Sequence, residues 1–271
     1  QLEQTACKVR IGIIEGVHAA KSGHPGGSLS IAEILTYLYF KEMNIDPENP
    51  KDPKRDRFVL SKGHAAPALY STLANRGYFS TDKLLTLRHI GSILQGHPDM
   101  KHIPGVDMST GSLGQGISAA VGMALSSKHF GDNYNVYTIL GDGEIEEGQV
   151  WEAAMFAANK GLSNLTAFID LNNLQIDGTI DEVNSAKPVD KKFEAFGWHV
   201  ITINGNDFDA IESALAEAKT VDKPVAIVAE TVKGKGVSFM ENAVNWHGSA
   251  PNDEQYEIAM AELNAALAAL N

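Results

Sequence analysis

Short apolar runs alternate with amphipathic segments along most of the chain. Two stretches at the start, residues 2–21 and 30–43, carry apolar residues at helical spacing, and Ser30 with Glu33 forms a capping-box pattern. From Arg57 onward, short apolar runs separate further helix-like segments. The runs span residues 58–60, 136–140, 165–169, 200–203 and 224–229. Runs this short and this apolar are typical of strands buried on both faces of a parallel sheet.

The segments between these runs complete an α/β pattern. We expect helices over residues 65–76, 117–130, 147–159, 191–196, 207–220 and 253–270. Strands that alternate with helices predict an open, mostly parallel sheet with helices on both faces. No internal repeat or low-complexity linker interrupts the pattern, so we expect residues 1–271 to form a single domain, with a surface loop at 46–57.

Composition excludes several classes of protein. With 44% hydrophobic and 21% charged residues among 271, the chain is neither disordered nor fibrous. The net charge of −12 opposes the attraction that drives binding to nucleic acid or to an anionic membrane. Cys7, the sole cysteine, rules out an internal disulfide, and no apolar run approaches the length of about 20 residues that a membrane span needs. The sequence shows no signal-peptide pattern, and we therefore expect a cytoplasmic protein. The chain opens on Gln1 rather than Met, so further residues can precede it.

Polar and glycine-rich segments directly follow three of the predicted strands. They are residues 61–64 (Ser-Lys-Gly-His), 141–144 (Gly-Asp-Gly-Glu) and 170–173 (Asp-Leu-Asn-Asn). Open parallel sheets bind ligands beyond the carboxyl ends of their strands. We therefore expect a binding site where these three segments meet.

The second and third segments suggest a metal that holds a diphosphate. A lone Gly-Asp-Gly also fits a tight turn, but Asn172 lies 30 residues after Asp142, at the end of the next predicted strand. Adjacent parallel strands bring these two side chains together. A carboxylate, an amide oxygen and a nearby main-chain carbonyl suit Mg²⁺ or Ca²⁺, with phosphate oxygens and water completing the shell.

These motifs carry a family resemblance. The segments GDGEIEEG and NNLQIDG are similar to the thiamine diphosphate fingerprint, and the whole chain resembles the amino-terminal, diphosphate-binding part of transketolase. Five further motifs occur in the family's order over residues 20–250: KSGHPG, SKGH, QGHP, TGSLGQG and WHG. The resemblance implies that the pyrimidine-binding and carboxyl-terminal domains are absent from this chain.

The resemblance also implies the roles of particular residues. Metal ligands would be Asp142, Asn172 and the main-chain carbonyl of Leu174. Cofactor contacts would be Gly111, Ser112, Leu113, Gly143, Ile176 and Lys233, together with Asn172, His64 and His247. Two positions depart from the pattern: Ser112 stands where the family often has proline, and Gly27 where the most similar branch tends to have a cofactor-contacting serine.

Four histidines differ from the rest because each lies in a loop punctuated by glycine or proline: His24, His64, His97 and His247. By resemblance they surround the reactive carbon of the cofactor, where imidazoles donate to an alkoxide or move a proton. His18, His89, His102, His129 and His199 match no motif and are assigned structural roles.

Glu147 and Glu152 have two interpretations. Acidic residues at a helix start are favourable on electrostatic grounds alone. The resemblance instead places both in a catalytically important glutamate network at a subunit boundary.

The implied function is the transfer of a two-carbon ketol unit between sugar phosphates, the transketolase reaction of class EC 2.2.1.1. The family's glutamate that activates the cofactor's pyrimidine lies in a later domain. The chain therefore resembles the amino-terminal subunit of a split transketolase, active only with a partner subunit in an α2β2 assembly; a fragment of a longer chain would look the same.

Alternative functions stay open at this point. One is a subunit of another thiamine diphosphate enzyme, similar to 1-deoxyxylulose-5-phosphate synthase or a keto acid dehydrogenase, although the His97 and WHG motifs argue against both. Another is a non-catalytic paralogue that binds a partner. A dinucleotide-binding domain is disfavoured because the glycines at 111–116 follow no predicted strand.

Overall fold

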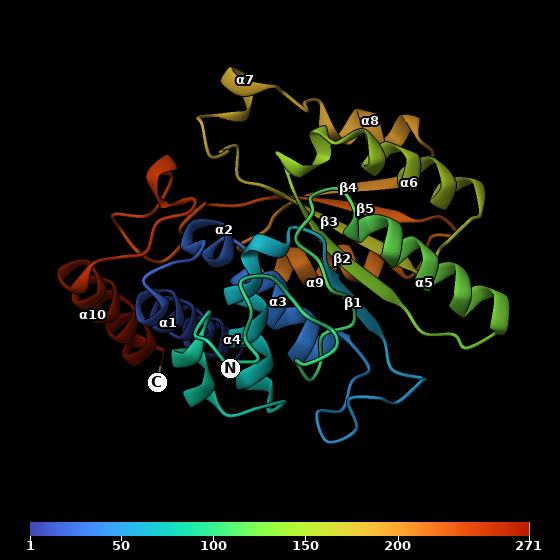
Figure 1. Ribbon diagram of the computed structural model, residues 1–271. Coiled ribbons are helices and arrows are strands. Elements are labelled where there is room, and N and C mark those ends of the chain that lie inside the picture. Colours follow the sequence, from blue (N-terminus) through green and yellow to red (C-terminus); the bar gives the residue numbers. More distant parts are fainter. Residues whose placement is uncertain (271) are drawn as a thin grey trace.

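A sheet of parallel strands runs through the centre of the protein. The computed structural model describes residues 1–270, and within them five strands pair in the order β1-β2-β3-β5-β4, all parallel (Figure 1). The strands are β1 (Arg57–Leu60), β2 (Val136–Gly141), β3 (Leu165–Leu171), β4 (His199–Asn204) and β5 (Val225–Glu230). The prediction of an open parallel sheet is confirmed.

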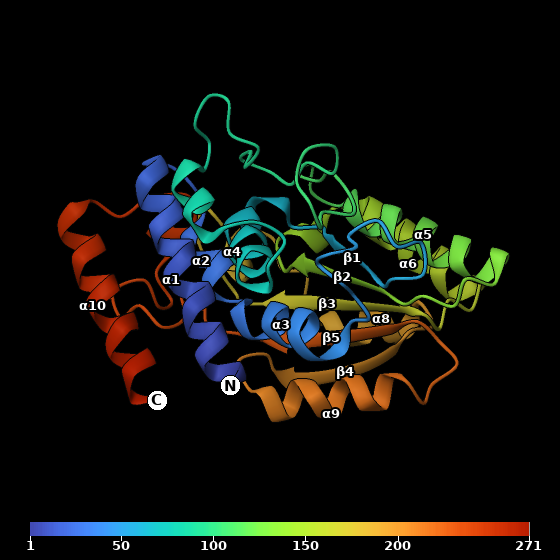
Figure 2. The ribbon, with the colours of Figure 1, turned by 90° about the horizontal axis from the view of Figure 1, so that it is seen from below.

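Helices cover both faces of this sheet, as the two views in Figures 1 and 2 show. One face packs against α1 (Leu2–Ala20), α2 (Pro25–Leu29), α3 (Ala32–Tyr37), α4 (Ala66–Arg76), α9 (Phe208–Ala218) and α10 (Asp253–Ala269). The other face packs against α5 (Gly116–Phe130), α6 (Gly148–Asn159), α8 (Val189–Ala195) and the short α7 (Ile180–Val183). In Figure 2, α10 lies beside α1 at the edge of the first layer.

The two hydrophobic cores explain why the strands read as continuous apolar runs. Successive side chains of a strand point to opposite faces, so Phe58 and Leu60 enter the first core and Val59 the second. In β2, Ile139 and Leu140 divide in the same way. Because both faces are covered by helices, the strands are mostly apolar on both faces, with Thr138, Thr166 and Asp170 as buried polar exceptions.

The predicted capping box at Ser30 and Glu33 is wrong. The Ser30 hydroxyl donates to Oδ2 of Asp170 (2.8 Å), and Glu33 forms an ion pair with Arg10 (2.6 Å). A separate short helix, α2, begins at Pro25, where the fixed φ of proline favours the first helical position. Partners distant in sequence therefore take both side chains away from the local cap.

The helix predicted over residues 30–43 is shorter: α3 ends at Tyr37, and a π-helical turn, Leu38–Glu42, follows it. The short α7 has no counterpart among the predicted helices. The other predicted helices and all five strands lie within about three residues of their predicted bounds, and residues 46–56 form the expected loop. Over residues 1–270, no helix is both long enough and apolar enough to cross a membrane.

Candidate active site

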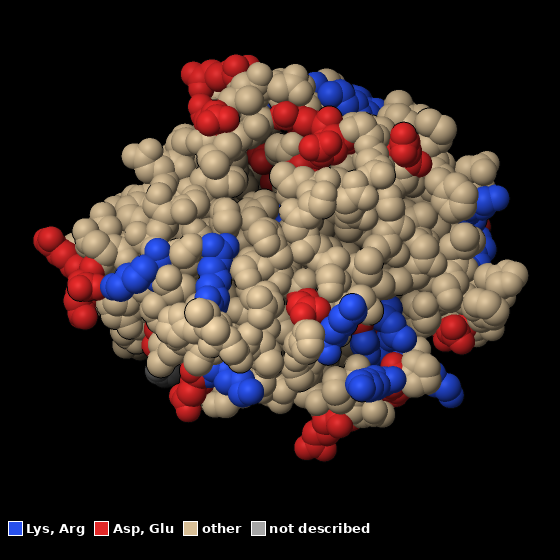
Figure 3. All heavy atoms as spheres, viewed as in Figure 1, with Lys and Arg blue, Asp and Glu red and all other residues tan. Residues whose placement is uncertain are grey.

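A cavity of about 330 Å³ opens at the carboxyl ends of β1, β2 and β3. Its volume lies within the range of small-molecule sites. Figure 3 shows a hollow in the upper part of this face with acidic atoms inside it. The lining residues come from the segments that follow the strands and from two further loops: His24, Gly27, Lys62, His64, Gly111, Leu113, Gly141, Asp142, Gly143, Glu144, Asn172, Leu174, Gln175, Ile176, Lys233 and His247.

Asp142 and Asn172 lie at the ends of neighbouring strands, because Gly141 of β2 pairs in register with Asp170 of β3. The Asp142 carboxylate accepts the main-chain N–H of Gly143 (2.9 Å) and that of Asn173 (2.5 Å). The bond from Asn173 joins the end of β3 to the end of β2.

The amide of Asn172 has a fixed orientation. Its Nδ2 donates to Oδ2 of Asp170 (2.9 Å), so its Oδ1 faces the other way and accepts the main-chain N–H of Leu174 (3.2 Å). Asp170 is fully buried and also accepts from Nζ of Lys62 (2.5 Å). Burial alone would raise the pKa of Asp170, but the charge and hydrogen bond of Lys62 hold it below its usual value. The buried Lys62–Asp170 pair thereby orients Asn172.

This donor set fits a hard divalent cation. Burial, together with the charge of Asp170, raises the pKa of Asp142 to about 6, so a cation beside this carboxylate would favour its ionised form. Among residues 1–270, no group of three or more His, Cys, Asp or Glu side chains could hold a metal. A metal in this cavity could take oxygen ligands from Asp142, the Asn172 amide and the Leu174 carbonyl, which are ligands that Mg²⁺ and Ca²⁺ accept.

Glycines allow the loops of the cavity to approach one another closely. Gly111 has a φ of +144°, and a Cβ there would lie 2.9 Å from the His97 ring. A Cβ on Gly63 would lie 2.6 Å from the main-chain nitrogen of Gly111. Gly27, Gly111, Gly141 and Gly143 line the cavity, so main chain without a side chain can face a ligand at these positions.

The buried carboxylate of Glu144 ties these loops together. It accepts the main-chain N–H groups of Gly114 and Gly141, both at 3.0 Å, and the hydroxyl of Ser61. One side chain therefore links the segments after β1 and β2 to the loop that precedes α5.

Three of the four predicted histidines form a cluster over the cavity. The ring centroids of His24 and His247 each lie 5.3 Å from that of His64, and 5.6 Å from each other. Burial lowers the pKa of His24 to about 4 and that of His247 to about 3, with a further contribution from nearby cations. The pKa of His64 is also well below its usual value, chiefly through burial. All three imidazoles are neutral at pH 7 and can both donate and accept a hydrogen bond.

Unsatisfied polar atoms mark a place for a ligand. The Nδ1 atom of His24 and the hydroxyl of Thr110 are buried and make no hydrogen bond. Leaving such groups without a partner costs about 1–3 kcal/mol each. His24 lines the cavity, so a polar ligand such as thiamine diphosphate could offer its Nδ1 a partner.

The neutral histidines make the stability of the ligand-free chain pH-dependent. An unfolded histidine takes up a proton near pH 6.5, whereas the folded His247 does so only near 3. The unfolded state therefore binds more protons between these values, and His247 lowers the free energy of unfolding as the pH falls through 6.5. We expect the melting temperature of the native chain to fall more steeply below pH 6.5 than that of His247→Gln. Parallel melting curves from pH 7.5 to pH 4.5 would contradict this.

Four predicted site residues lie off the cavity lining. His97 packs against Gly111 at the rim, and burial with the nearby charge of Arg88 lowers its pKa. Ser112, Glu147 and Glu152 are exposed, and Glu147 packs against Gly114. The structure does not bring the two glutamates to the cavity.

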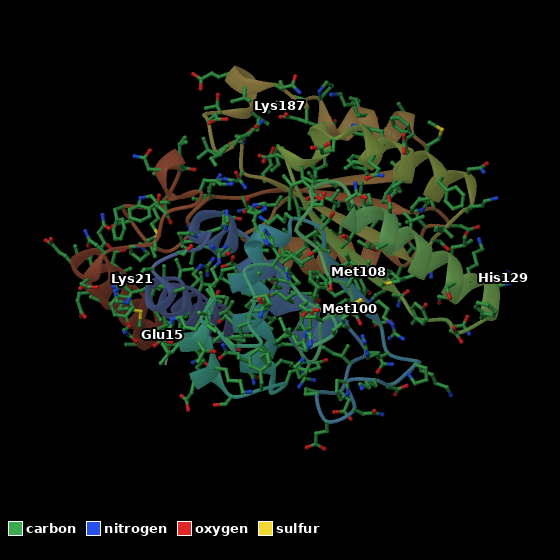
Figure 4. All side chains as sticks on the ribbon, viewed as in Figure 1. Glu15, Lys21, Met100, Met108, His129 and Lys187 are labelled. Carbon is green, nitrogen blue, oxygen red and sulfur yellow. The ribbon has the colours of Figure 1, made fainter. Side chains whose placement is uncertain are left out.

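Two other predictions concern residues around the site. Gly27 does line the cavity, and a Cβ there would have room, 3.5 Å from Nζ of Lys62. The five histidines assigned structural roles contact residues outside the cavity, and Figure 4 places His129 at the far end of α5.

Sequence reasoning missed Lys62, Glu144, Asp170 and Gln175. All four stand inside segments already singled out, and a charged residue close to the end of a buried strand was the available signal for Lys62, Glu144 and Asp170. Lys62 and Asp170 are separated by 108 residues, so only the fold shows that they pair.

Comparisons with known proteins give one consistent family. The family described as "Transketolase, thiamine diphosphate binding domain" matches residues 2–265. The chain is 49% identical to the 6-deoxy-6-sulfo-D-fructose transketolase subunit SqwG of Clostridium sp. (strain MSTE9), covering 97% of this chain and 96% of that protein. It is 45% identical to one of the subunits of the apulose-4-phosphate transketolase of Phocaeicola vulgatus, covering 97% of this chain and 94% of that protein.

A solved structure, that of transketolase from Campylobacter jejuni, superposes with a TM-score of 0.91 at 34% identity. The match covers 97% of this chain but 42% of that one.

Proposed function

The chain belongs to the transketolase family, as a thiamine diphosphate-binding domain, and we propose that it supplies the diphosphate half of an active site completed by a second polypeptide or domain. We propose further that residues 1–271 form one such domain, that the metal is Mg²⁺ or Ca²⁺ and that the protein works in the cytoplasm. The observation that carries this function is the cavity itself, where Asp142, Asn172 and the Leu174 carbonyl adjoin three neutral histidines.

Each part of the cavity has a role in holding the cofactor. Asp142, Asn172 and the Leu174 carbonyl would ligate the metal. Gly143 would contact the diphosphate, the main chain of Gly111 and Ser112 would lie under the cofactor, and Lys233 and Lys62 would supply positive charge. Leu113 and Ile176 would contact its apolar parts. Bound thiamine diphosphate supplies a carbanion that cleaves and re-forms the bond next to a ketose carbonyl.

The histidines would serve the substrate. A neutral imidazole donates a hydrogen bond to a substrate oxygen as negative charge develops there, and it accepts a proton from a hydroxyl without first losing one. The low pKa values keep His24, His64 and His247 neutral at pH 7, so each ring has one N–H to donate. A ring with so low a pKa is a weak base, so hydrogen-bond donation is the role that this environment favours. His97, at the rim, is assigned to the hydroxyl groups of the donor sugar.

A partner would cover the open side of the cavity. Leu113 and Ile176 are 37% and 64% exposed although they line the site, so apolar surface is left without cover. Glu147 and Glu152 are exposed, so a partner surface could reach them and form the proposed glutamate network. We assign to the partner the glutamate that activates the pyrimidine. An α2β2 assembly would cover the apolar surface at Leu113 and Ile176 and place a partner surface against Glu147 and Glu152.

The reaction proposed is ketol transfer between sugar phosphates or related acidic sugars. The two bacterial subunits carry names that specify different sugars, a sulfofructose and apulose 4-phosphate. We therefore assign the transketolase reaction type and leave the pentose phosphate substrates of EC 2.2.1.1 as one member of the substrate class.

Binding and chemistry can be separated with two histidine variants in the assembled enzyme. His97→Ala should raise the donor KM or lower kcat by about tenfold or more, with little change in thiamine diphosphate affinity. His64→Ala should impair catalysis and also lower the affinity for thiamine diphosphate, because His64 lines the cavity and His97 does not. Steady-state kinetics together with cofactor titration measure the difference. Equal losses of cofactor affinity in the two variants would refute this assignment.

A further inference from the structure

A buried ammonium group lies on the carbonyl that the proposed metal site requires. Nζ of Lys233 donates to the Leu174 carbonyl oxygen (2.8 Å) and lies 2.9 Å from Nδ1 of His247. The Lys233 side chain is 1% exposed. Both of its partners are neutral acceptors.

The other buried lysine of the cavity is held differently. Lys62 is 1% exposed and forms an ion pair with Asp170 at 2.5 Å. In the part of the chain that the structure describes, no carboxylate lies within 4.0 Å of Nζ of Lys233. Lys233 is thus a buried cation without a carboxylate in direct contact, and an anion that entered the cavity would attract it strongly.

A metal and Lys233 cannot both use the Leu174 carbonyl without strong repulsion, because two cations would share one oxygen in a buried site. The carbonyl itself is held in place: Leu174 N–H donates to Asn172, and Leu174 pairs with Thr179 in an isolated β-bridge. The flexible four-carbon side chain of Lys233 is therefore the part that must move.

Resting on the metal site of the proposed function, we propose that Lys233 occupies the metal's place on Leu174 until a diphosphate arrives. Phosphate oxygens then take the N–H donors of Lys233, and the carbonyl becomes available to the metal. The metal alone binds weakly, and metal and diphosphate each strengthen the binding of the other, since such coupling is reciprocal.

Mn²⁺ titration followed by electron paramagnetic resonance tests this on the chain as it stands, with and without inorganic pyrophosphate. The native chain should bind Mn²⁺ alone weakly. Pyrophosphate should raise its affinity for Mn²⁺ by about tenfold or more. Lys233→Met should bind Mn²⁺ alone about tenfold more tightly than the native chain and gain little from pyrophosphate. The matched control is Lys235→Met, in the same loop but partly exposed, which should behave as the native chain does.

Further variants keep the result interpretable. If Lys233→Met does not melt cooperatively, Lys233→Gln replaces it. Glutamine retains an N–H for the carbonyl but has no charge, so the same gain in affinity for Mn²⁺ alone is expected. Adding Asp142→Asn to the Lys233 variant should remove the gain in Mn²⁺ affinity; a gain that survives places Mn²⁺ elsewhere and overturns the proposal. A folded Lys233 variant can also bind Mn²⁺ alone no more tightly than the native chain does. If pyrophosphate still strengthens Mn²⁺ binding to the native chain, that result overturns the proposal for Lys233 but not the metal site. A native chain that binds no Mn²⁺ even with pyrophosphate overturns the metal site as well.

Discussion

Replacing Asp142 by alanine is expected to weaken thiamine diphosphate binding in the presence of Mg²⁺ by about 100-fold or more, since the loss of even an indirect metal partner costs 10–100-fold. Asp142 is the only carboxylate in the proposed ligand set, and the neutral Asn172 and Leu174 oxygens cannot offset the charge of a divalent cation. Isothermal titration of the assembled enzyme measures the loss.

The variant should nevertheless fold. Asp142 accepts two main-chain N–H groups, so its removal costs about 1–3 kcal/mol of stability for each and lowers the melting temperature without abolishing cooperative unfolding. Asp177→Ala is the matched control, because Asp177 is an exposed carboxylate in the segment that carries Asn172 and Leu174. Native cofactor affinity in Asp142→Ala would remove Asp142 from the metal site.

The second large effect is dependence on a partner. The chain purified alone should show no ketol transfer above background, even with saturating thiamine diphosphate and Mg²⁺. We attribute the activation of the pyrimidine to a glutamate on the partner, and the apolar surface at Leu113 and Ile176 is uncovered without it. Co-expression with the product of the adjacent reading frame should restore turnover.

The control is the same assay on a preparation that mass spectrometry shows to be free of any partner. Robust turnover by that preparation would refute the shared-site proposal.

Much of the fold could be predicted because both faces of the sheet are buried. A strand with two covered faces has few polar positions, so its limits stand out as a change from mostly apolar residues to glycine, aspartate and asparagine. That change occurs at Gly141 and at Asn172, which is why the two ends of the metal site could be predicted from their spacing. The Ser30 cap failed for the opposite reason, because a partner distant in sequence takes the hydroxyl.

The support behind the site could not be predicted in the same way. Lys62 and Glu144 stand beside predicted site residues, but their roles depend on which loops meet at the cavity. Glu144 accepts from three segments, and nothing local distinguishes it from the exposed Glu147 three residues later. The roles of Glu147 and Glu152 depend on a partner surface and stay predictions.

A structure of the assembled enzyme with thiamine diphosphate and Mg²⁺ tests the central claim most directly. The account predicts a metal bound to Asp142, Asn172 and the Leu174 carbonyl, with the diphosphate beside Gly143 and Lys233 and the pyrimidine reaching a glutamate of the partner. A cofactor bound outside this cavity, or one enclosed by this chain alone with its pyrimidine on a residue of the same chain, would contradict it.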